Sequence, residues 1–198
     1  ETNSPSGWHT RSNTNQLGFV ANPQDNNWLS YYGDFFTPGS PLEAWGVKIN
    51  GTSYVNANGA TAQIMGTLNT AACDVRVCRQ NSSAVTWTGD VAGMHIEQQY
   101  AIANGGMFII ISTVMTNNNA SPLNNVYWFR NVDPDNSQPT TGSYSTNNTI
   151  VSQSDATTEL ASVKAEGGDG ATLYLMSSDS RARVTHGGFN NNDAEQIW

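Results

Sequence analysis

Hydrophobic and polar residues alternate most regularly in the middle of the chain, over residues 91–102. Every second residue there shares one face of an extended chain: Met94, Ile96, Gln98, Tyr100 and Ile102. A period of two is expected of a half-buried strand. Asn104-Gly105-Gly106 predicts a chain reversal, because paired glycines accept the positive φ of a tight turn. Residues 107–115 are apolar on both faces, which predicts a central strand covered on both sides.

The same pattern predicts many short strands elsewhere. Asn50-Gly51 between two β-rich runs predicts a hairpin over residues 44–49 and 52–55. Further strands are predicted at residues 17–20, 61–65, 84–87, 126–130, 149–153, 158–164, 171–176 and 182–185. Gly, Pro and Asn residues separate them, and no amphipathic helix of ten residues is predicted. The sequence therefore predicts an all-β fold, an antiparallel β-sandwich.

The two ends of the chain differ from this pattern. Residues 1–16 are polar and aperiodic, with Trp8 as their large apolar group, which predicts an extended N-terminal segment ahead of a single β-sandwich domain over residues 17–198. Residues 193–198 become strand-like and finish on Trp198. We expect a large sandwich that is incomplete as it stands, and that is completed by further sequence or by a segment of another chain.

Composition narrows the classes of partner. Only 12% of the 198 residues are charged, and the formal net charge is −8. The eight Lys and Arg residues form no cluster, so the chain offers no electrostatic footprint for nucleic acid. No run of about 18 apolar residues is present, so membrane insertion is not expected either.

Glycosylation sequons are the first signal of an extracellular or cell-surface location. Four occur, at Asn50, Asn81, Asn119 and Asn147, each in a stretch that we expect to be a loop able to carry a glycan. In a chain this rich in Asn, Ser and Thr, several sequons are also expected by chance. The low content of Lys and Glu points to the same location.

The two cysteines are a further signal. A disulfide between Cys73 and Cys78 would close a small loop and stabilise it by about 2 kcal/mol. A straight strand would hold the two residues roughly 17 Å apart, so the bond requires a bend. Two buried thiols are the alternative to this bond.

An aromatic cluster lies in residues 28–36. It is explained either by core packing under a long loop or by a ligand platform, since aromatic rings beside acidic and amide groups commonly hold sugars or aromatic side chains. The candidate ligand-binding residues are Trp28, Tyr31, Tyr32 and Asp34.

The densest group of acidic and amide side chains follows residues 126–130. Asp133, Asp135 and Asn136 place two carboxylates and an amide oxygen within four residues, with Pro134 stiffening the turn. Hard oxygen ligands of this kind suit Ca²⁺, and Asp25, Asp34 or Glu43 would add ligands if folding brought them near. Alternatively Asp133 caps the turn and Asp135 is solvated. A general acid/base pair would also need two carboxylates, together with a cleft.

No other pattern points to catalysis. His9, His95 and His186 are far apart in the sequence, and neither HExxH nor GxSxG occurs. His95 is expected at the surface of a strand, and His186 in a turn from which it can approach a ligand. We therefore expect that the protein is not an enzyme.

Four segments resemble a known kind of module: GSPLEAWGV at residues 39–47, YWFRNVDPDN at 127–136, TNNTIV at 146–151 and RARV at 181–184. Together they resemble adhesin-like β-sandwich modules of large, modular, secreted or surface-anchored microbial proteins. The resemblance implies an extracellular placement, a structural or adhesive role, and a domain that continues past Trp198. It implies no catalytic residue.

These observations favour an extracellular structural or adhesive module, a subunit of a surface filament or layer that assembles through β-strand contacts. Its expected partners are copies of itself or neighbouring modules. A carbohydrate- or peptide-binding adhesin domain that recognises surface glycans is the alternative, and a polysaccharide-active enzyme is the third class.

Overall fold

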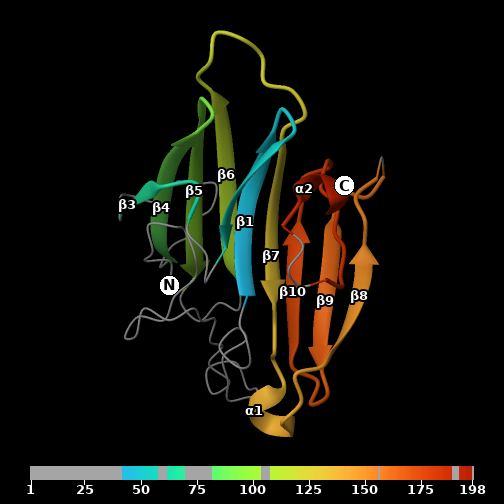
Figure 1. Ribbon diagram of the computed structural model, residues 1–198. Coiled ribbons are helices and arrows are strands. Elements are labelled where there is room, and N and C mark those ends of the chain that lie inside the picture. Colours follow the sequence, from blue (N-terminus) through green and yellow to red (C-terminus); the bar gives the residue numbers. More distant parts are fainter. Residues whose placement is uncertain are drawn as a thin grey trace.

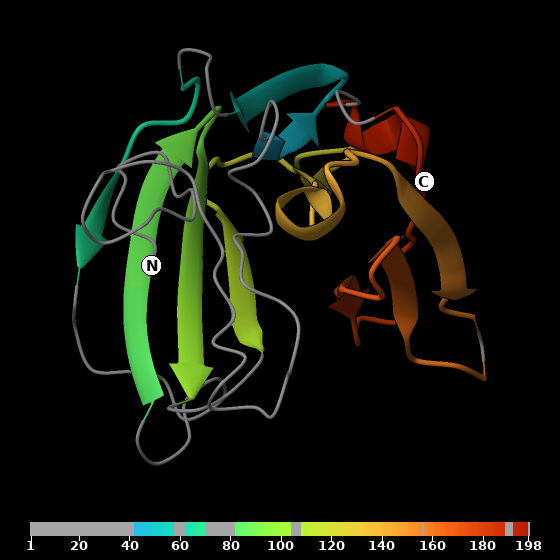
Figure 2. The same ribbon diagram turned by 90° about the horizontal axis from the view of Figure 1, so that it is seen from below.

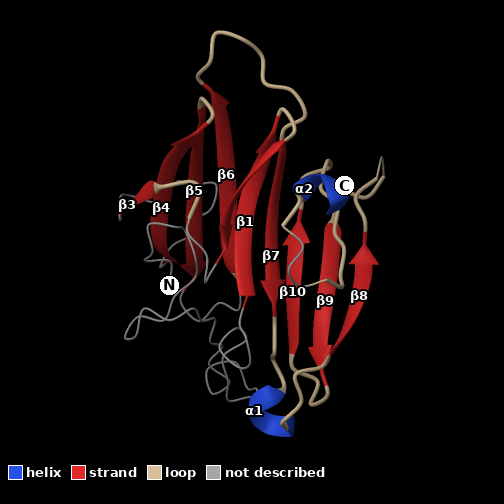
Figure 3. Ribbon diagram, in the orientation of Figure 1, coloured by secondary structure: helices blue, strands red, loops and turns tan. Residues whose placement is uncertain are grey.

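The computed structural model describes residues 42–57, 62–69, 82–103, 108–155, 157–188 and 192–197. In these residues the protein is an all-β fold of three antiparallel sheets with two helices of four residues each (Figures 1 and 3). The predicted fold class is therefore confirmed. No helix in the described ranges is long and apolar enough to cross a membrane.

The first sheet has the strand order β2-β1-β7 and is formed by β1 (Leu42–Ile49), β2 (Thr52–Ala57) and β7 (Tyr127–Asp133). β1 and β2 form the predicted hairpin. Asn50 and Gly51 close it with φ values of 51° and 83°. Two consecutive positive φ angles define the turn that matches the twist of a two-residue hairpin.

The second sheet has the order β3-β4-β5-β6, formed by β3 (Gly66–Asn69), β4 (Ser82–Val91), β5 (Met94–Ala103) and β6 (Ile109–Asn117). The strand predicted at residues 91–102 begins later, because Val91 belongs to β4. Ala92 and Gly93 form another two-residue turn with φ values of 50° and 75°. Alanine rarely adopts positive φ, so the sequence did not mark this turn.

Two further strand predictions are wrong. β6 is not a central strand: within the described part of the chain it lies at the edge of its sheet, and Ile110 is 45% exposed. Residues 62–65 form bends instead of the strand predicted at 61–65. Here the Asn56 side chain takes the place of a neighbouring strand, because its Nδ2 donates to the Ile64 carbonyl at 2.7 Å and its Oδ1 accepts from the Ile64 N–H at 2.8 Å.

The third sheet has the order β10-β9-β8, formed by β8 (Thr146–Ser152), β9 (Ala161–Gly167) and β10 (Thr172–Ser177). A bulge interrupts β8 between Ile150 and Ser152. The strand predicted at residues 182–185 does not form, since this segment pairs with a side chain instead. Gln153 Nε2 donates to the Val184 carbonyl at 2.6 Å, and Gln153 Oε1 accepts from the Val184 N–H at 3.0 Å.

The two helices are α1 (Gln138–Thr141) and α2 (Ala194–Ile197). The strand-like end predicted at residues 193–198 is wrong, because α2 packs against β1 and β7 with Ala194 buried beside Ala44 and Phe129. Lys48 of β1 holds α2 by ion pairs to Asp193 (3.1 Å) and Glu195 (2.6 Å).

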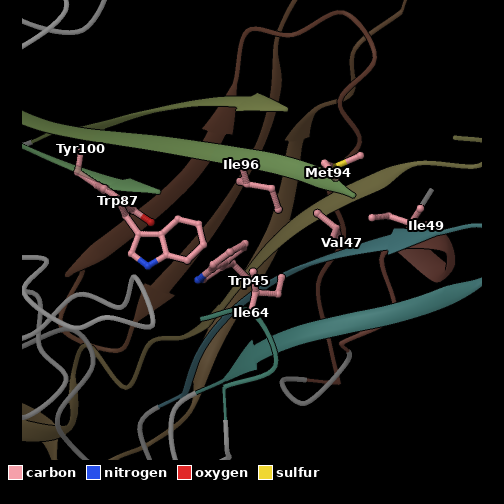
Figure 4. Packing of buried hydrophobic residues seen from close by; sticks show 8 residues of the cluster. All are labelled: Trp45, Val47, Ile49, Ile64, Trp87, Met94, Ile96 and Tyr100. Atoms are coloured by element: carbon pink, nitrogen blue, oxygen red, sulfur yellow. The ribbon is translucent and has the colours of Figure 1, made fainter. Parts of the chain in front are cut away.

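The first and second sheets pack face to face as two layers. Their inner faces share one core of fully or nearly fully buried side chains, shown in Figure 4: Trp45, Val47, Ile49, Ile64, Trp87, Met94, Ile96 and Tyr100. At its centre the rings of Trp45 and Trp87 meet edge to face, with centroids 4.9 Å apart. The third sheet lies beside β7, away from the second sheet, as Figure 2 shows from below.

Candidate functional site

A groove separates the first sheet from the third. It is a cavity of about 230 Å³ lined by the end of β7 and Pro134 (residues 130–134), by residues of β8, β9 and β10, and by residues 183–188. In the described part of the chain β7 pairs with β1 alone and β10 pairs with β9 alone, and residues of both strands line the cavity. We call this cavity the β7–β10 groove.

Strand register makes one wall of the groove apolar. Leu175 lies opposite Val163, which lies opposite Ile150. Leu173 lies opposite Ala165, two residues away from the first pair on each strand. Residues paired across antiparallel strands share a face, so these side chains form one partly exposed apolar surface.

Residues 183–188 form a second wall. The Gln153 side chain fixes Val184, and nearby the Ser154 hydroxyl donates to the Asp179 carbonyl at 3.2 Å. Gly187 and Gly188 then turn the chain with positive φ angles of 87° and 57°. His186 lies between these features and lines the cavity.

A buried polar network lies where β7 borders the core. Arg130 forms an ion pair with Glu43 of β1, and their side chains are 6% and 1% exposed. Arg130 Nη1 also donates to Tyr100 Oη at 3.2 Å, and Tyr100 Oη donates to Gln98 Oε1 at 3.1 Å. Burial lowers the pKa of Arg130 to about 9, which leaves the guanidinium charged at neutral pH. The network joins the first sheet to β5 of the second sheet.

Charges around the groove are nearly balanced. Arg130 is matched by Glu43, and Lys164 lies 2.5 Å from Glu166. Arg183 and Asp133 both line the groove. Arg183 Nη1 also donates to the Ala182 carbonyl at 2.8 Å. The groove therefore suits a neutral, polar or mixed occupant better than a strongly charged one.

The turn that follows β7, residues 133–137, lies at one end of the groove, and we call it the acidic turn. Asp135 is 6% exposed, while Asn136 and Ser137 are fully buried. Asn136 Nδ2 donates to the carbonyls of Ala165 (3.1 Å) and Ala171 (2.6 Å) and so ties the turn to the β9–β10 hairpin. The interpretation of Asp135 as a solvated residue is wrong, because the turn is covered where it docks on that hairpin.

Burial also affects the carboxylates of the acidic turn. It raises the pKa of Asp133 and, together with the negative charge of Asp133, raises the pKa of Asp135 from 3.8 to about 6. Two carboxylates that lie close together and lack full solvation disfavour each other's ionised form.

The acidic turn continues into α1, which is docked on the same hairpin. The Ser137 carbonyl accepts hydrogen bonds from the N–H groups of Thr140 and Thr141 at 3.1 and 2.9 Å, and the Thr140 hydroxyl donates to Asp169. Gly167 makes the contact close, since a Cβ at this position would lie 2.4 Å from Ser137 Cβ.

Several predicted site residues lie outside the described residues. These are the ligand platform, the disulfide and one sequon: Trp28, Tyr31, Tyr32, Asp34, Cys73, Cys78 and Asn81. The extended segment 1–16 and the additional ligand Asp25 also lie outside them. Glu43 does not join the acidic turn, because Arg130 binds its carboxylate.

Three sequons can be placed. Asn50 and Asn119 are exposed in the predicted loops, where Asn50 Oδ1 accepts from the Asn124 N–H at 2.9 Å and Asn119 Nδ2 donates to the Ala92 carbonyl at 3.1 Å. Asn147 is exposed as well, but it lies in β8 rather than in a loop. The strand begins three residues earlier than expected because the polar residues 146–148 pair with β9.

Sequence reasoning missed the polar network and Gly167. A charged residue inside a strand is the available signal for the network: Arg130 and Glu43 each interrupt an apolar run. No local pattern marks Gly167, since its contact is with a residue thirty positions earlier.

Comparisons with protein families, with curated proteins and with solved structures find no match to this chain. Among the described residues, no three Asp, Glu, His or Cys side chains gather as a group that could hold a metal ion. A metal at the acidic turn would therefore need amide, hydroxyl or backbone oxygens beside its two carboxylates.

Proposed function

We propose that this protein is an extracellular structural and adhesive module, a subunit of a surface filament or layer that assembles with copies of itself or neighbouring modules through β-strand contacts. The observation that carries the proposal is that, among the described strands, β7 pairs with β1 alone and β10 with β9 alone, and that both strands line the groove. The resemblance of the sequence to surface modules supports the same role.

An unpaired strand edge offers a row of N–H and C=O groups that an extended segment of another chain can satisfy. β7 and β10 run in opposite directions (Figure 1), so an inserted strand would be parallel to one and antiparallel to the other. Pairing with either edge would extend that sheet by one strand.

The size and chemistry of the groove favour a strand of another chain over a small ligand. Its volume of about 230 Å³ lies below the range of about 300–1,000 Å³ that is usual for small-molecule sites. Its apolar wall of Val163, Leu173 and Leu175 suits one large apolar side chain. We propose residues 1–16 of a neighbouring copy as the donor, with Trp8 as its anchor, because this segment is polar and carries one Glu and one Arg.

Deletion of residues 1–16 tests this assignment of the donor. The shortened chain should keep its circular dichroism spectrum and lose assembly in size-exclusion chromatography with light scattering, whereas the full chain should assemble. A separate peptide of residues 1–16 should bind the shortened chain. Assembly of the shortened chain at the level of the full chain would contradict the proposed donor.

A further inference from the structure

The acidic turn gathers more oxygen atoms than its own hydrogen bonds use. Neither carboxylate of Asp133 and Asp135 has a hydrogen-bond or ion-pair partner among the described residues, although Asp135 is 6% exposed. Asn136 Oδ1 and Ser137 Oγ are both buried without a hydrogen-bond partner. Buried polar atoms are nearly always paired in folded proteins, so these unpaired oxygens require an explanation.

The orientation of Asn136 shows where its oxygen points. Nδ2 faces the β9–β10 hairpin, because it donates to the carbonyls of Ala165 and Ala171. The two ends of a side-chain amide diverge, so Oδ1 points away from these two carbonyls, and it is buried without a hydrogen-bond partner.

We infer that the acidic turn binds one Ca²⁺ ion through Asp133, Asp135 and Asn136. Ca²⁺ takes oxygen ligands alone and tolerates irregular geometry with additional waters, whereas Mg²⁺ demands a near-ideal octahedron. Two carboxylates supply the charge, and the amide oxygen supplies a neutral ligand. Asp133 lines the β7–β10 groove, which gives the ion a path from solvent.

Binding at this position would have a mechanical consequence. Asn136 is tied to β9 and β10, while Asp133 is the last residue of β7. An ion held by both residues therefore links the end of the first sheet to the third sheet and fixes the width of the groove. This inference does not depend on assembly, because the ion site lies within one chain.

The test is calcium titration of the full chain after chelator treatment, followed by isothermal titration calorimetry and thermal unfolding. One ion should bind, with a Kd of about 10⁻⁴ to 10⁻³ M as in extracellular calcium modules. A tenfold excess of Ca²⁺ over Kd should raise the melting temperature by about 3 to 6 °C. The double variant Asp133→Asn with Asp135→Asn keeps the side-chain shapes and should lose both signals.

The matched control is Asp90→Asn with Glu97→Gln, which removes the same two charges from β4 and β5 and should respond to Ca²⁺ like the wild type. Equal calcium binding by the Asp133/Asp135 variant would overturn the inference. So would a folded wild type that binds no Ca²⁺ at about 10 mM, ten times the weakest Kd expected. This last result decides the question even if the double variant does not fold.

Discussion

Arg130 is the residue through which the two packed sheets share a polar contact. It bonds to Glu43 in its own sheet and to Tyr100 in the facing sheet, and its guanidinium carbon lies 5.4 Å from the centre of the Tyr100 ring. A buried ion pair adds little net stability, since desolvation offsets most of the attraction. Loss of one partner is costly, because the other charge is then buried without compensation.

Substitution of Arg130 tests this asymmetry. Arg130→Met should lower the free energy of unfolding by about 3–5 kcal/mol, because Glu43 would remain buried without its cation. Glu43→Leu added to Arg130→Met should recover most of that loss, since apolar residues of similar volume replace the pair. Urea denaturation at neutral pH measures both effects.

Arg181→Met is the matched control, since Arg181 is 85% exposed and pairs with Asp179 at the surface. An exposed ion pair contributes about 0–1 kcal/mol, so this variant should unfold almost like the wild type. An Arg130→Met variant as stable as Arg181→Met would show that the buried pair does not hold the sheets together.

At the scale of elements, the acidic turn and the β9–β10 hairpin form the joint between the first and third sheets. Their contact depends on Gly167, where the backbone of β9 approaches the Ser137 side chain. Gly168, the next residue, has room for a side chain, because a Cβ there would lie 3.9 Å from its nearest neighbour, Thr141 Cγ2.

These adjacent glycines provide a matched pair of substitutions. Gly167→Ala should cost about 1–3 kcal/mol, because the new methyl group separates the hairpin from the acidic turn. Gly168→Ala should change stability by no more than about 0.5 kcal/mol. Thermal unfolding compares the two variants, and similar melting temperatures would argue that the turn does not dock closely on the hairpin.

The sequence predicted elements well where local chemistry decides structure. Asn50-Gly51 closes a hairpin because both residues accept positive φ, whereas Ala92-Gly93 forms the same turn without an equally clear signal. The position of β6 at a sheet edge depends on strand order, which alternation does not encode. The helix at residues 194–197 forms where Lys48 and the β1–β7 surface hold it, and that tertiary contact overrides a strand-like pattern.

The sequence likewise predicts only part of the candidate site. The oxygen-rich sequence of Asp133, Asp135 and Asn136 is visible without a structure, but its burial against β9 and β10 is not. The β7–β10 groove was not predictable at all, because it is formed by segments up to 58 residues apart that meet through sheet packing. In the part of the chain that the structure describes, β7 and β10 each pair with a single strand, and that follows from strand order rather than from local sequence.

At the scale of the molecule, the first and second sheets share a two-layer core, whereas the third sheet lies apart from the second sheet (Figure 2). Large apolar side chains of the third sheet are exposed on the described surface, and one of them, Ile150 (40%), is aligned with Val163 and Leu175 of the groove wall. Exposed apolar side chains near an unpaired strand edge are the usual features of an assembly surface.

The measurement that tests assembly most directly is the molar mass of the protein in solution, by light scattering over a range of concentrations. Wild type should exceed the chain mass of 21.3 kDa, and Leu175→Lys should remain at it, because the new charge lies in the apolar wall of the groove. Met176→Lys, on the opposite face of β10, should assemble like the wild type. A wild type that stays at 21.3 kDa at every concentration, or a folded Leu175→Lys variant that assembles equally well, would contradict the account.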